Sequence, residues 1–144
     1  MTLLYGPMTH AELRRYLLAN YPESRLELLT EEKRCTLVAR HPELPADYFQ
    51  FLSEVGWGTI GEGRYSVYSA PVEPSFVFGP GAGAGAAESL NSVVLVGDDF
   101  AGGQEAFRFE RKGVVFGSVD SLDGRFEPAG ETFSEFIQRW FVTT

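Results

Sequence analysis

The chain of 144 residues has the usual length of one domain, and 44% of its residues are apolar, including 12 phenylalanines. Burial of so much apolar surface can offset the entropy cost of ordering the chain, which excludes an intrinsically disordered protein and predicts a single domain over residues 1–144. The formal net charge of −8 at pH 7 repels phosphate groups, so we expect no direct binding to nucleic acid or to an anionic membrane.

The negative charge belongs to one part of the chain. Residues 1–44 carry six acidic and six basic side chains, whereas residues 45–144 carry fourteen acidic and six basic side chains. This part of the chain would attract a basic partner, although the same charge also serves ordinary solubility.

Cys35 is the only cysteine. An internal disulfide and a cysteine metal cluster are therefore excluded, as is typical of proteins in a reducing compartment. The sequence shows neither a signal peptide nor a run of about 18 apolar residues that could cross a membrane. We therefore expect a cytoplasmic protein.

Three helices are predicted in the first 56 residues. Thr9 and Glu12 form a T-x-x-E capping box, which predicts a helix over about residues 9–20. The segment "TEEKRCTLVARHP" predicts a second helix, which Thr30 caps at its start and which ends before the proline. The segment "LPADYFQFLSEVG" predicts a third, which ends at Gly56 because glycine readily adopts the left-handed conformation at a helix end.

After residue 64 the apolar period changes from about 3.6 to 2, which predicts strands. The candidate strands are "RYSVYS", "SFVF", "SVVLVG", "EAFRFE", "GVVFGSV" and "RFEP". The segments "RKG" at 111–113 and "DG" at 123–124 are typical of hairpin turns, and the Gly/Ala segment at 79–89 is typical of a flexible surface loop.

The chain closes with a helix of aromatic character. Thr132 and Glu135 form a second capping box before "FSEFIQRWF", whose apolar residues, including Trp140, we expect in the core. The order of elements predicts an α+β fold, with a single twisted, mainly antiparallel sheet backed by helices.

The segment "GWGTIGEGRY" contains the G-x-G-x-x-G spacing of nucleotide-binding loops at Gly56, Gly58 and Gly61. Such loops lead from a strand into the N-terminus of a helix, where backbone amides hold the phosphates. Here a helix ends at Gly56 and we expect the next strand to start at Tyr65, so the loop would present the negative end of a helix dipole. We interpret it as a helix-to-strand junction that binds no nucleotide.

Other catalytic or metal-binding chemistry is weakly supplied. Asp98 and Asp99 follow an apolar strand, as metal ligands can, but "GDDFAGG" is also typical of a turn and lacks a histidine nearby. His10 lies in a capping box and His41 precedes a proline, which predicts surface positions for both. We therefore expect no catalytic residue, no metal, no cofactor and no enzymatic activity.

Four features together resemble the SUKH (Smi/Knr-like) superfamily. They are the "LPADY" helix start leading to a Gly-Trp-Gly turn, the "PVEP" step, the "GDDFAGG" turn between strands and the aromatic helix "ETFSEFIQRWF". The resemblance covers about residues 30–142, while the predicted helix within residues 1–29 and the loop at 79–89 depart from a compact member.

This resemblance implies an α+β fold and a non-enzymatic binding function. Many bacterial members are immunity proteins that neutralise polymorphic toxins, often nucleases or deaminases, encoded by an adjacent gene. The resemblance thus implies a basic toxin domain as the partner, which agrees with the acidic charge of residues 45–144. The namesakes of the superfamily are fungal cell-wall regulators, so a regulatory or scaffold protein without a toxin partner is the alternative.

Four residues are candidates for contact with a protein partner. We predict Trp57 as an aromatic anchor, and Glu62, Asp98 and Asp99 as charges that face the partner. For Trp57 the alternative is a core residue that packs under the sheet. A third class of function, a sensor of small ligands or an enzyme, would show as a thermal shift with nucleotides or divalent metals, and we expect none.

Overall fold

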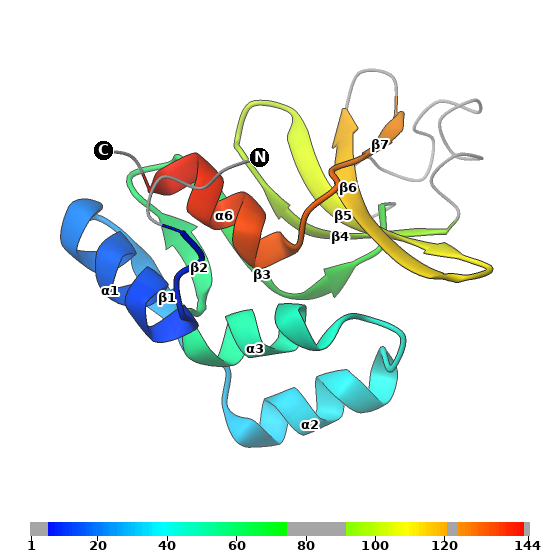
Figure 1. Ribbon diagram of the computed structural model, residues 1–144, viewed down its shortest axis with the longest axis horizontal. Coiled ribbons are helices and arrows are strands. Elements are labelled where there is room, and N and C mark those ends of the chain that lie inside the picture. The colour runs from blue at the N-terminus through cyan, green and yellow to red at the C-terminus, as the bar shows by residue number, and fades with distance from the viewer. Residues whose placement is uncertain (1–5, 75–91, 121–123, 143–144) are drawn as a thin grey trace.

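The predicted α+β fold is confirmed by a computed structural model that describes residues 6–74, 92–120 and 124–142. Seven strands form one antiparallel sheet in the order β1-β2-β3-β4-β5-β6-β7, which is also their order in the chain. Helices α1, α3 and α6 lie together on one side of the sheet, and α2 lies on the far side of α3 (Figure 1). None of the helices within the described ranges is long and apolar enough to cross a membrane.

The elements have the following bounds along the described chain. The helices are α1 (His10–Asn20), α2 (Glu31–Arg40), α3 (Ala46–Glu54) and α6 (Phe133–Phe141). The strands are β1 (Arg25–Glu27), β2 (Trp57–Ile60), β3 (Tyr65–Val72), β4 (Val93–Asp98), β5 (Gly103–Glu110), β6 (Gly113–Asp120) and β7 (Phe126–Pro128).

The predicted helix starts are confirmed by their caps. The Thr9 hydroxyl accepts from the Glu12 amide at 3.1 Å, and the Glu12 carboxylate accepts from the Thr9 amide at 3.0 Å. That backbone hydrogen bond lowers the pKa of Glu12. Thr132 and Glu135 form the same reciprocal pair at the start of α6, and these bonds satisfy amides that the first turn of a helix leaves free.

The glycine-rich segment after α3 is partly strand, which corrects the predicted junction. Gly56 ends the helix with φ +123°, as predicted, but β2 begins directly at Trp57 and pairs with both β1 and β3. A Cβ at Gly58, whose φ is +125°, would lie 2.0 Å from the carbonyl oxygen of Arg25. The glycine spacing therefore serves close strand pairing, and strands β1 and β2 were missed by the sequence analysis.

The main core lies between the sheet and helices α1, α3 and α6, and it is rich in aromatic rings. Phe133 of α6 packs 4.9 Å from the ring centroid of Phe51 and 5.7 Å from that of Phe116. On the other face of the sheet a smaller apolar cluster forms around Leu95, and the guanidinium of Arg108 covers the Phe126 ring at 4.4 Å. The predicted strand at 75–78, the predicted loop at 79–89 and Asp123 of the predicted "DG" turn lie outside the described residues.

Candidate partner-binding surface

The turns β2–β3 and β4–β5 lie at the same end of the antiparallel sheet. The strand register pairs Ser66, which follows the first turn closely, with Asp98, which opens the second. The structure therefore brings Glu62, Asp98 and Asp99 to one end of the sheet. Trp57, at the start of β2, lies at the opposite end of its strand from the β2–β3 turn, so the four predicted contact residues do not form one patch.

Both aspartates of the β4–β5 turn hold the backbone of the turn. Asp98 Oδ1 accepts from the amide of Phe100 at 2.9 Å. Asp99 Oδ1 accepts from the amides of Ala101 and Gly103 at 2.8 and 2.9 Å. The two side chains are half-buried, so they shape the turn as well as contribute negative charge.

Phe100 lies at the tip of this turn in a conformation that few residues other than glycine adopt. Its φ is +62°, and 56% of the residue is exposed. A left-handed conformation costs about 1–2 kcal/mol for a residue with a Cβ, and the bond from Asp98 to its amide helps to hold it. The turn thus fixes a large apolar side chain in solvent, a feature that the sequence analysis missed.

Trp140 is a second exposed aromatic residue at this end. The prediction that it lies in the core is wrong, because 41% of the residue is exposed. Its ring nevertheless packs 5.5 Å from that of Tyr65, the first residue of β3, and 5.0 Å from that of Phe136. We refer to Glu62, Asp98, Asp99, Phe100 and Trp140 together as the hairpin-end surface.

Two separate polar contacts, one buried and one half-buried, lie beneath the hairpin-end surface. The Tyr65 hydroxyl donates to Glu105 Oε1 at 2.5 Å, and the Tyr68 hydroxyl lies 2.6 Å from Asp98 Oδ2. Burial is the main cause that raises the pKa of Glu105 to about 7; the bond from Tyr65 opposes the increase, and the charges of Asp99 and Asp98 add to it. The pKa of Tyr65 is also raised, by burial and by Glu105. A proton on Glu105 near neutral pH thus limits the repulsion between neighbouring carboxylates.

Trp57 has properties of both alternatives considered for it. Its half-buried side chain packs against the main core, and it also lines two grooves on the surface. One groove, of about 420 Å³, runs along β1 and β2, and the other, of about 650 Å³, lies between α2 and β3. Trp57 is thus neither a fully buried core residue nor part of the hairpin-end surface.

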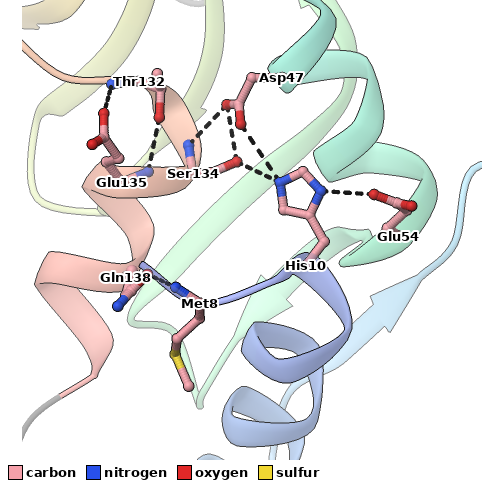
Figure 2. Close-up of polar contacts among 8 residues, drawn as sticks. All are labelled: Met8, His10, Asp47, Glu54, Thr132, Ser134, Glu135 and Gln138. Carbon is pink, nitrogen blue, oxygen red and sulfur yellow. Dashed lines mark hydrogen bonds and ion pairs between the residues drawn. The ribbon is translucent and has the colours of Figure 1, made fainter. Parts of the chain in front are cut away.

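His10 forms the centre of a polar cluster between three helices, which corrects its predicted surface position. Its side chain is only 13% exposed. Figure 2 shows the ring between Glu54 of α3, 2.8 Å from Nδ1, and Ser134 of α6, whose Oγ lies 2.8 Å from Nε2. Asp47 Oδ2 in turn accepts from the Ser134 hydroxyl at 2.9 Å and from its amide at 3.2 Å.

The connectivity Ser134–His10–Glu54 is that of a serine-hydrolase triad, but the hydrogen-bond pattern favours a structural clamp. A nucleophilic serine must give its proton to the histidine, whereas the single hydroxyl proton of Ser134 is donated to Asp47. The cluster therefore ties α1 to α3 and α6, and neither of the two grooves described above is lined by it.

A second contact from α1 reinforces this helix packing. Arg14 Nη1 donates to the carbonyl of Val55 at 2.6 Å, where α3 ends. A cation at a helix C-terminus stabilises the unpaired carbonyl groups there. In the described ranges, no group of three or more His, Cys, Asp and Glu side chains is arranged to hold a metal ion.

Comparisons of the chain with protein-family models, with curated proteins and with solved structures found no match. The SUKH resemblance therefore stays a prediction.

Proposed function

We propose that this protein is a non-enzymatic, cytoplasmic protein-binding domain of the SUKH type, and that it acts as an immunity protein against a nuclease or deaminase toxin encoded by an adjacent gene. The observation that carries the proposal is Phe100, a large apolar side chain that a strained turn holds in solvent. Exposed aromatic residues on a rigid support are typical centres of protein interfaces, because little conformational entropy is lost when they bind.

The chemistry around Phe100 favours a basic partner. Asp98, Asp99 and the exposed Glu62 lie at the same end of the sheet. Enzymes that cleave or modify nucleic acids need positive charge near the active site to bind phosphates. An acidic surface with an aromatic anchor can enter such a cleft, block it and attract it over distance. The proposed mechanism is thus a steric and electrostatic blockade without turnover.

The test is the affinity of the purified chain for the product of the adjacent gene. We expect Phe100→Ala to weaken binding about 30-fold, which corresponds to about 2 kcal/mol and is typical of a central aromatic contact. Glu62→Lys should weaken binding mainly at low salt, because a charge at the rim of an interface is screened by ions. Asp98 and Asp99 are unsuitable for charge reversal, since their carboxylates hold the turn.

Glu43→Lys is the matched control for Glu62→Lys. Glu43 is an exposed glutamate between α2 and α3, so the change in net charge is the same and the hairpin-end surface is untouched. Equal effects of the two substitutions would contradict the electrostatic part of the proposal. The alternative of a regulatory or scaffold protein predicts no binding to the adjacent gene product at all.

A further inference from the structure

The larger of the two grooves described above lies between α2 and the second half of β3, away from the hairpin-end surface. Its volume of about 650 Å³ is within the range of sites that bind small molecules or short peptide segments. Leu29, Leu37, Trp57 and Ala70 contribute apolar side chains to its lining. The groove therefore offers apolar contact area beside a strand.

Within the described residues, β3 extends past the start of β2 and leaves part of one backbone edge without a partner strand. β2 pairs with β3 only as far as Gly58↔Val67. The pairing of β3 with β4 skips from Val67↔Gly97 to Val72↔Leu95. The skip on the β4 side is a β-bulge within the sheet. On the β2 side, residues 69–71 lie beyond the paired segment and have no paired residue among the described residues. An open strand edge of this kind is a template for an additional strand.

The charges on the helical wall favour an acidic occupant. Lys33 and Arg40 both line the groove, at a spacing of seven residues that places them on one face of α2. Both are exposed, and neither forms an ion pair with another described residue. Among the described residues of the lining, Glu32 is the single acidic one. These residues of the groove therefore carry a net positive charge in a protein whose net charge is −8.

We propose that this groove binds an extended peptide segment of a partner protein, in which acidic side chains flank an apolar one. The peptide adds to the open edge of β3 through its backbone. Its apolar side chain lies on Trp57 and Leu37, and its carboxylates lie near Lys33 and Arg40. This site is separate from the hairpin-end surface, and it does not depend on the toxin partner proposed above.

The experiment is a selection from a displayed library of random heptapeptides on the immobilised full-length chain. We expect enriched peptides to alternate Asp or Glu with apolar residues. A synthetic peptide of the enriched sequence should shift the NMR signals of the Ser69 and Ala70 amides and of the Trp57 indole. Methylation of its backbone nitrogens should abolish binding, because strand addition requires those N–H groups.

A pair of double variants provides the matched test. Lys33→Glu/Arg40→Glu should weaken peptide binding by about tenfold or more, since each reversed contact contributes up to about 1 kcal/mol at an exposed position. Arg111→Glu/Lys112→Glu makes the same change of charge in the exposed β5–β6 turn and should leave the affinity unchanged. Absence of any enriched peptide, enriched peptides without acidic residues, or equal affinities of the two double variants would overturn the proposal.

Discussion

Replacing Glu105 by glutamine removes a titratable group from beneath the hairpin-end surface, and we expect it to change how protein stability depends on pH. Glu105 is 5% exposed and accepts a hydrogen bond from the Tyr65 hydroxyl. A glutamine oxygen can accept the same bond, so the substitution keeps the packing and the contact. What it removes is the cost of ionising a buried carboxyl.

The size and sign of the effect follow from the pKa of Glu105. In the folded protein this pKa is raised to about 7, compared with an ordinary value of 4.5. This difference in pKa corresponds to a contribution of at most about 3 kcal/mol to the free energy of unfolding. Because the folded state holds the proton more tightly, the stabilisation is fully present below pH 4.5 and is lost as the pH rises through 7. The free energy of unfolding of the wild type should therefore fall over this range relative to that of Glu105→Gln.

The assay is urea denaturation of both proteins at pH 5 and at pH 8. From pH 5 to pH 8, the free energy of unfolding of the wild type should fall by roughly 2–3 kcal/mol relative to that of Glu105→Gln. Glu127→Gln, a change at an exposed position of β7, serves as the control and should follow the wild type. A Glu105→Gln protein that loses stability in parallel with the wild type would refute the reasoning.

Further substitutions test other parts of the fold, each by denaturant unfolding. Gly58→Ala should lower the free energy of unfolding by about 3 kcal/mol, because the added Cβ would lie 2.0 Å from a carbonyl oxygen of β1. Gly63→Ala should lower it by only about 1 kcal/mol, because φ is +68° there but the space around the added Cβ is open. Tyr48→Phe should leave the free energy of unfolding unchanged or raise it by about 1 kcal/mol, since the buried Tyr48 hydroxyl has no hydrogen-bond partner among the described residues; a large loss would contradict this. His10→Ala should cost about 2 kcal/mol because it breaks the bonds that join α1 to α3 and α6, and an unchanged midpoint would show that the clamp is dispensable. Phe100→Gly should stabilise the fold by about 1 kcal/mol while it weakens partner binding, and a loss of stability would mean that the turn is not strained.

The helices were predictable because their end signals are local. The capping boxes at Thr9 and Thr132 and the glycine at position 56 each act within one turn of helix. Strands β1 and β2 escaped prediction because they are three and four residues long and β2 contains a glycine. β1 and β2 pair residues that are about thirty positions apart in the sequence. Segments this short are too brief to show the alternation of apolar and polar residues that predicts a strand.

The candidate site was predictable only in part, for a similar reason. An acidic turn between strands can be recognised in "GDDFAGG", and the meander order then places Glu62 at the same end of the sheet. The exposure of Phe100 and Trp140 depends on which side of a turn or helix faces the core, which is a tertiary property. The contacts of His10 with Glu54 and Ser134 span 44 and 124 positions, so no spacing in the sequence could reveal the clamp.

The measurement that tests the central proposal most directly is the activity of the toxin encoded by the adjacent gene as the chain is added. We predict that activity falls to background at a one-to-one ratio, and that the Phe100→Ala protein needs an excess of about 30-fold under dilute conditions. Undiminished toxin activity at a large excess of the wild-type chain, or equal inhibition by the Phe100→Ala protein, would contradict the proposed function and the role of the hairpin-end surface.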